Sequence, residues 1–161
     1  MLALLLALAQ ITPVAPIVHG TGLPPAADSE ADTQGVLATV RRLLNAIEAN
    51  DAAALTAVTR ADGGATAAIE LPGGRRRVDR LSWAEFTRLL KPGPDRYRET
   101  ITDPAVEVDG DIAMVWSPYV LRRNGAVDHC GYDHFDLVRE NGAWRVLNVT
   151  WSERTTGCAA Q

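Results

Sequence analysis

The chain has 161 residues, of which 47% are hydrophobic and 22% are charged, and its formal net charge is −4. This length and composition are typical of one globular domain with a single core. The acidic balance argues against nucleic acid or an anionic membrane as a partner, because both usually require a basic protein face.

The first 19 residues resemble a secretory signal. After Met1, residues 2–9 are only Leu and Ala, and a further apolar stretch to Val18 contains two prolines. This apolar run is too short to span a bilayer. Residues 20–30 are typical of a flexible linker. We therefore expect export to the periplasm or the extracellular space, with no stable membrane insertion once the leader is removed. A cytoplasmic protein with a disordered tail is the alternative.

The predicted domain covers residues 31–154, leaves 155–161 as a tail, and begins with two helices. Asp32 or Thr33 can cap a helix from Gln34 to about Ala49. Its apolar residues recur at three- and four-residue steps and would form one stripe facing the core: Val36, Leu37, Val40, Leu43, Leu44 and Ile47. An Ala-rich helix through Leu55 and Val58 follows.

The next segments mix strand, loop and helix signals. Gly63-Gly64 is expected to end the helical unit, with a short strand over 65–71 and a loop over 72–77. Arg75, Arg76, Arg77 and Arg80 lie in or next to that loop, where a solvated surface is the simple interpretation and an anion-binding patch the alternative. Ser82 and Glu85 form a capping box for a third helix, which ends at 91–94.

Three two-residue turn signals then separate strands rich in branched and aromatic residues. They are Asp109-Gly110, Asn124-Gly125 and Asn141-Gly142, which favour tight hairpins. The expected strands cover 97–102, 105–108, 112–121, 127–139 and 144–153, and the last four form an antiparallel meander. Pro118 inside a strand, and a change of phase in the bulky residues around Leu147-Asn148, both predict bulges or bends in a curved sheet.

The strand over 127–139 carries the only dense polar cluster. Alternation places His129 and Asp133 on the face that also carries Phe135 and Leu137, so both polar groups should point inward. Gly131 between them would leave room for a ligand. A buried Asp and His can bind a ligand, catalyse proton transfer, or serve only as hydrogen-bonded structural groups.

The remaining candidates are aromatic residues and cysteines. Five aromatic side chains are candidates to line a ligand cavity or, alternatively, to fill the core: Trp83, Phe86, Trp116, Tyr119 and Trp144. Cys130 and Cys158 form a possible disulfide in an exported protein. No residues with metal-ligand spacing occur, and no dinucleotide or phosphate-loop motif is present, so we expect neither metal nor cofactor.

Several segments resemble those of a known family. They are residues 46–52 (AIEANDA), 108–119 (VDGDIAMVWSPY), 129–139 (HCGYDHFDLVR) and 142–146 (GAWRV). They are similar to the nuclear transport factor 2-like superfamily, and in particular to small members described as putative lumazine-binding or SnoaL-like. The resemblance implies an α+β fold, in which N-terminal helices pack against a strongly curved, mainly antiparallel sheet around a conical pocket. It also implies a homodimer through the outer face of the sheet.

Three functions remain open at this point. The first is binding of a small apolar or aromatic molecule in the cone, oriented by His129 and Asp133. The second is cofactor-independent isomerisation, dehydration or cyclisation, with Asp133 as base, His129 as its partner and Tyr119 as a donor. The third is a non-catalytic interaction or dimerisation module. Because the superfamily hosts all three, the fold does not choose among them.

Overall fold

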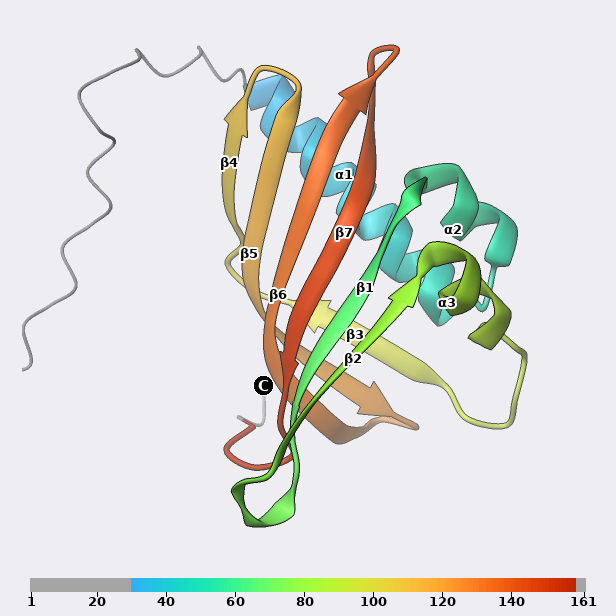
Figure 1. Cartoon of the computed structure of the whole chain (residues 1–161), viewed down its shortest axis with the longest axis vertical. Coiled ribbons are helices and arrows are strands. Elements are labelled where there is room, and N and C mark those ends of the chain that lie inside the picture. Colours follow the sequence, from blue (N-terminus) through green and yellow to red (C-terminus); the bar gives the residue numbers. More distant parts are fainter. Residues whose placement is uncertain (1–29, 159–161) are drawn as a thin grey trace, which may run out of the picture.

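The computed structural model describes residues 30–158, so the predicted leader and most of the linker lie outside the described residues. Three helices and seven strands form an α+β fold (Figure 1). Their bounds are α1 Glu30–Glu48, α2 Ala52–Val58, β1 Thr59–Glu70, β2 Arg76–Ser82, α3 Trp83–Leu89, β3 Tyr97–Ile101, β4 Ala105–Asp109, β5 Ile112–Arg123, β6 Ala126–Glu140 and β7 Ala143–Glu153, with a 3₁₀ turn at Pro72–Gly74. None of the helices within 30–158 is long and apolar enough to cross a bilayer.

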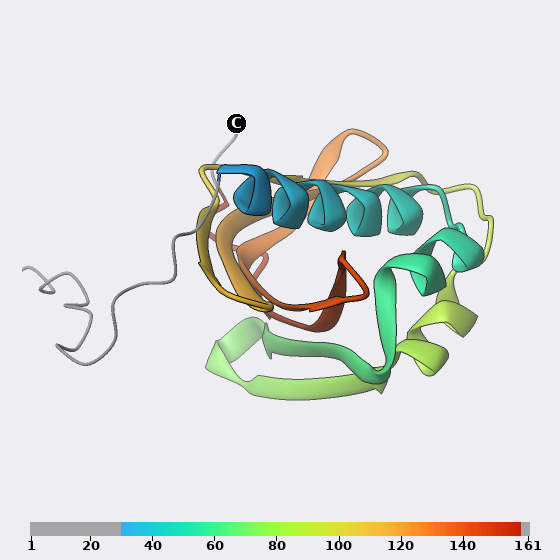
Figure 2. The same ribbon diagram turned by 90° about the horizontal axis from the view of Figure 1, so that it is seen from above.

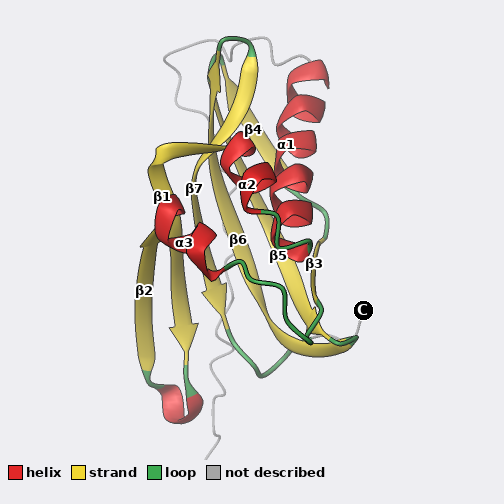
Figure 3. Cartoon of the chain, turned by 90° about the vertical axis from the view of Figure 1, so that its right-hand side faces the viewer, coloured by secondary structure: helices red, strands yellow, loops and turns green. Residues whose placement is uncertain are grey.

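The strands form one curved sheet in the order β2-β1-β7-β6-β5-β3, and β4 also pairs with β5. All pairs are antiparallel except β1 with β7. The predicted meander of the last four strands is therefore confirmed. All three helices lie on one side of the sheet (Figure 3), and α1 crosses the concave side of the meander (Figure 2).

The turns explain why the meander is predictable. Asn124-Gly125 and Asn141-Gly142 have positive φ at both positions, as two-residue hairpins of this kind require. The first turn is shifted by one residue, because Asp109 still pairs with Ile112. Gly110, with φ 58°, is therefore the first turn residue and not the second.

The β1–β2 hairpin departs from the prediction in two places. β1 continues through Gly63-Gly64, and β2 occupies part of the predicted loop and continues to Ser82. Strand β2 lies at the sheet edge and is mostly exposed, so it lacks the apolar alternation that marks a strand. Gly63 is required by packing, because a Cβ there would lie 1.7 Å from the Leu147 carbonyl oxygen.

One of the two expected bulges is present. Pairing passes from Asp136 with Asn148 to Leu137 with Val146, which leaves Leu147 as the extra residue of β7. Pro118 causes no register shift, so of the bulge or bend expected there, no bulge forms. The Pro118 carbonyl accepts a hydrogen bond from the Thr102 amide, at the corner between β3 and β4. The pairing of β5 with β3 and β4 is interrupted at this corner, so the N–H that proline lacks is not needed there.

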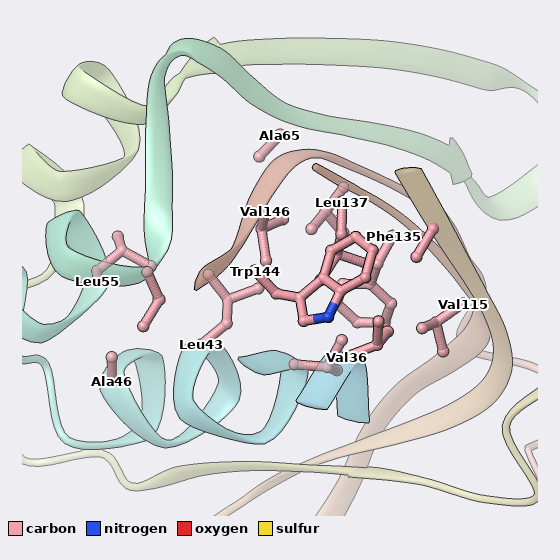
Figure 4. Close-up of a cluster of buried hydrophobic side chains, with 14 of the residues drawn as sticks. Val36, Leu43, Ala46, Leu55, Ala65, Val115, Phe135, Leu137, Trp144 and Val146 are labelled. Atoms are coloured by element: carbon pink, nitrogen blue, oxygen red, sulfur yellow. The ribbon is translucent and has the colours of Figure 1, made fainter. Parts of the chain in front are cut away.

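The core lies between α1 and the concave face of the sheet. The predicted stripe of α1 is confirmed, with Val36, Val40 and Leu43 fully buried, although the helix begins four residues earlier than expected. These residues meet Phe135 and Trp144 of the meander (Figure 4). The capping box of α3 is also present, and Leu89 at the end of this helix is exposed.

A disulfide joins Cys130 of β6 to Cys158 in the C-terminal tail, with the two Cα atoms 5.6 Å apart. The tail is also held by backbone bonds, because Cys130 and Arg154 exchange both amide-to-carbonyl hydrogen bonds at 3.0 Å. Together these links fix the chain directly after β7 against the lower end of β6, next to the polar residues of that strand.

Candidate functional site

The pairing of the strands gathers the polar residues of β6 on the concave face. Asp133 pairs with Ser117 of β5 on one side and with Trp151 of β7 on the other. The next cross-strand pair on the same face is Phe135 with Val115. A register shift at Asp128 falls between His129 and the hairpin, so it leaves His129 on the same face as Asp133. Asp133 is only 3% exposed.

Gly131 does not open a space between these two side chains. A Cβ at this position would lie 1.8 Å from the Ser152 carbonyl oxygen. The same oxygen accepts a hydrogen bond from the Tyr119 hydroxyl at 3.0 Å, and the Ser152 hydroxyl accepts from the Tyr132 amide. The expectation that Gly131 makes room for a ligand is wrong, because the β7 backbone takes that room.

The decisive feature of the site is a second acid, Glu99 of β3. Its carboxyl group is the hydrogen-bond partner of the Asp133 carboxyl group. Burial, followed by the charge of the nearby Glu99, raises the pKa of Asp133 to about 9. Burial raises the pKa of Glu99 to about 7, against the opposing effects of Asp133 and His129. The two acids therefore titrate as a pair that retains a proton at neutral pH.

Neighbouring donors do not satisfy Asp133. Ser117, directly opposite, donates its hydroxyl to backbone carbonyls. Tyr119 donates to Ser152, and burial followed by the Asp133 and Glu99 charges raises the pKa of Tyr119 above its usual range. Asp133 Oδ2 consequently has no hydrogen-bond partner within residues 30–158. Since buried carboxyl oxygens normally have a donor, this atom is a candidate contact for a ligand group.

His129 is held at the edge of the pair by other acids. Its Nδ1 lies 3.0 Å from Asp128 Oδ2, and its Nε2 lies 4.0 Å from Glu153 Oε2. Its ring packs edge-on against Tyr119, with ring centroids 5.7 Å apart. Both ring nitrogens of His129 therefore face carboxylate oxygens, and its ring contacts Tyr119.

The predicted aromatic residues are distributed over three environments. Trp83 donates its indole N–H to the bulged Leu147 carbonyl at 2.8 Å, with Phe86 edge-on against it. Trp144 is in the core, with the Arg139 guanidinium 4.7 Å from its ring centroid. Trp116 lies on the convex face, 45% exposed and stacked on Tyr132. Of the five, only Tyr119 adjoins the acid pair.

A cavity of about 320 Å³ lies between α1 and β3, with Glu99 in its wall. Its other lining residues come from the same two elements and the turn after β3: Leu37, Arg41, Leu44, Asn45, Glu48, Arg98, Thr100, Ile101 and Pro104. This volume is at the small end of the range for ligand sites. Glu99 therefore connects a cavity that is open to solvent with the buried Asp133.

Other groups show no comparable arrangement. In the part of the chain that the structure describes, no three His, Cys, Asp or Glu side chains could together hold a metal ion. The predicted basic run is partly ordered in β2, where Arg77 pairs with Asp79 at 2.8 Å. Arg76, Arg77 and Arg154 border a second hollow of about 310 Å³ beside the end of β7.

Comparison with known proteins agrees with this geometry. Residues 31–152 match the model of the family described as "Putative lumazine-binding". The chain belongs to this family. In the comparison with curated proteins, none matches this chain.

Solved structures share the fold of this lumazine-binding-family member at low identity. A cystatin-like protein of unknown function from Nostoc punctiforme has a TM-score of 0.62 at 11% identity, covering 80% of this chain and 95% of that one. A nuclear transport factor 2-like protein from Cytophaga hutchinsonii has a TM-score of 0.61 at 17% identity, with 79% and 100% coverage. The association domain of CaMKII from C. elegans has a TM-score of 0.58 at 21% identity, with 76% and 95% coverage. The expected superfamily is confirmed.

Proposed function

We propose that the protein binds a small organic molecule with an apolar or aromatic body in the cavity between α1 and β3. The observation that carries this proposal is Asp133, a buried acid with an oxygen that lacks a partner among the described residues. Its neighbour Glu99 lines the cavity, together with the apolar side chains of Leu37, Leu44 and Ile101. A ligand N–H or O–H would supply the missing donor.

The chemistry of the acid pair suits ligands that both donate and accept hydrogen bonds. Two carboxyl groups that share one proton offer an O–H donor and several acceptor oxygens. Cyclic amides present an N–H beside a carbonyl, which is complementary to such a pair. The family description supports this class of ligand, because lumazine is a bicyclic heteroaromatic compound with N–H and C=O groups along its edge.

Filling the cavity is expected to abolish binding. We expect lumazine or the neutral aromatic amide 2-naphthamide to shift the backbone amide NMR signals of Glu99, Ile101 and Leu44. In Leu44→Trp the indole would occupy the cavity, and these shifts should be lost. Leu89→Trp, at an exposed position of α3, is the matched control and should bind normally. Shifts confined to other regions, or shifts that persist in Leu44→Trp, would contradict the proposal.

Cofactor-independent proton transfer is the second candidate function, and the acid pair favours it. A catalytic base is most effective when its pKa lies near the working pH. Glu99, with a pKa of about 7, meets this condition better than Asp133, which retains its proton at neutral pH. In this candidate mechanism Glu99 is the base and Asp133 the acid. Tyr119 and His129 position the pair.

The convex face favours a homodimer. Trp116 and Tyr132 stack with ring centroids 5.3 Å apart and remain 45% and 40% exposed, next to the exposed Ile112 and Met114. An exposed aromatic patch of this kind is typical of a protein interface. We propose that two copies associate through it. Sedimentation velocity would test this, since Trp116→Lys should dissociate the dimer and a monomeric wild type would exclude it.

The disulfide supports our proposal that the protein is exported. Structural disulfides persist in oxidising compartments and are rare in the cytosol. The bond between Cys130 and Cys158 is therefore consistent with the signal-like first 19 residues. Fractionation of the native host should find the mature protein outside the cytoplasm, and recovery of the full-length chain from the cytosol would contradict this.

A further inference from the structure

We infer that the molecule bound between α1 and β3 is an anion, a small apolar compound carrying one carboxylate; this inference rests on the proposed function and specifies its ligand class. It starts from two arginines in the cavity wall. Arg41 comes from α1 and Arg98 from β3, so the two guanidinium groups come from the two elements that enclose the cavity.

Neither arginine is used by the fold. Within residues 30–158, Arg41 and Arg98 make no ion pair and no side-chain hydrogen bond, and both are exposed at the cavity. Two arginines that join different elements are paired instead: Arg60 with Asp62 and Glu140, and Arg139 with Asp111 and Asp32. The Arg41 and Arg98 guanidinium groups therefore remain available to a ligand at this cavity, in a protein whose net charge is negative.

The acids at the cavity do not cancel this charge. Glu48 and Glu99 are the acids in its lining. Glu99 lies beside Asp133, and the two share a proton, so Glu99 contributes only a fraction of a negative charge to the cavity at neutral pH. Two arginines then stand against Glu48 and the partly protonated Glu99. The cavity consequently favours an anion, and guanidinium groups suit the planar geometry of a carboxylate.

The positions of the charges give the ligand an orientation. The carboxylate would meet Arg41 and Arg98, which are exposed, and the apolar body would contact Leu37, Leu44 and Ile101. A hydrogen-bonding group at its other end would reach Glu99, which lines the cavity and lies beside Asp133. A molecule with a charge at one end and a neutral polar group at the other matches this arrangement, whereas a neutral amide uses only part of it.

The test compares 2-naphthoate with 2-naphthamide, two compounds of the same shape that differ in charge. Calorimetric titration at pH 6.5 should give at least tenfold tighter binding of 2-naphthoate, corresponding to ~1.4 kcal/mol. Arg41→Ala and Arg98→Ala should each reduce that preference severalfold, and the double variant should remove it. Arg88→Ala, which deletes an exposed arginine that borders neither cavity, is the control and should keep it.

The outcomes separate this inference from the proposed function. Equal affinity for both compounds, or a preference that survives in the double variant, would overturn the anionic ligand while leaving the binding cavity in place. Binding of neither compound would overturn the anionic ligand and contradict the cavity proposal as well. Since the arginine side chains are exposed, circular dichroism and the melting temperature of each variant should match those of the wild type.

Discussion

Asp133→Asn is expected to be more stable than the wild type at pH 8, by several kcal/mol, and similar to it at pH 4. Each pKa unit of difference between the folded and unfolded states is worth ~1.4 kcal/mol. In the unfolded chain Asp133 loses its proton near pH 4, whereas burial keeps it protonated in the folded protein, where the pKa is about 9. Between these two pKa values, the folded state therefore binds more protons than the unfolded state.

The direction of the pH dependence follows from this difference. Below pH 4 both states hold the proton, so the acid carries no penalty. As the pH rises above 4 the unfolded state is progressively favoured, and the loss of stability is complete only above the folded pKa. Asparagine has no proton to lose, and its amide can donate to Glu99. The stability of the variant should therefore depend less steeply on pH, and the remaining dependence should come from the raised pKa of Glu99.

Urea unfolding at pH 4, 6 and 8 would measure this effect. Asp109→Asn is a suitable control, because Asp109 at the end of β4 is exposed and makes no side-chain ion pair or hydrogen bond within residues 30–158. The control should follow the wild-type curve. If Asp133→Asn were instead destabilised equally at all three pH values, Asp133 would be an ionised structural group and the shared proton would be excluded.

Gly131→Ala is expected to destabilise the protein by at least ~3 kcal/mol and to distort the acid pair. The added methyl group would lie 1.8 Å from the Ser152 carbonyl oxygen, so β6 and β7 would have to separate. That separation would break the two hydrogen bonds that Ser152 accepts, one from the Tyr119 hydroxyl and one from the Tyr132 amide. The strain arises from close packing of two backbones, since Gly131 itself has no positive φ.

Gly93→Ala provides the comparison for this substitution. A Cβ at Gly93 would have its nearest contact at 4.0 Å, and its φ is not positive, so the melting temperature should change little. A thermal melt of both variants distinguishes the local clash from the general effect of replacing glycine. A Gly131→Ala protein as stable as the wild type would show that β6 and β7 are not in close contact here.

Strand alternation predicts the inward direction of Asp133 and His129 because Phe135 and Leu137 share their parity within one strand. The register shift of β6 occurs at Asp128, beyond both residues, so it does not disturb this relation. Turn residues likewise predict the meander, because positive φ at Asn and Gly is a local property.

Glu99 could not be found in the same way. It lies on a five-residue edge strand, and its relation to Asp133 depends on β5 lying between β3 and β6. Local alternation does not specify which strands become neighbours. The one signal in the sequence was that Glu99 lies two residues from Ile101, so both side chains point to the same face of β3. The position of Trp116 shows the same limit, since its strand is apolar on both faces and only the packing of α1 decides which face is covered.

Carbon-13 NMR titration of the side-chain carboxyl groups tests the shared proton most directly. Asp133→Asn and Glu99→Gln would assign the two signals. The structure predicts that both titrate above their ordinary ranges, that Asp133 is still protonated at pH 7, and that removing either acid shifts the titration of the other. Independent titration of both groups near pH 4 would contradict the buried acid pair and the ligand site built on it.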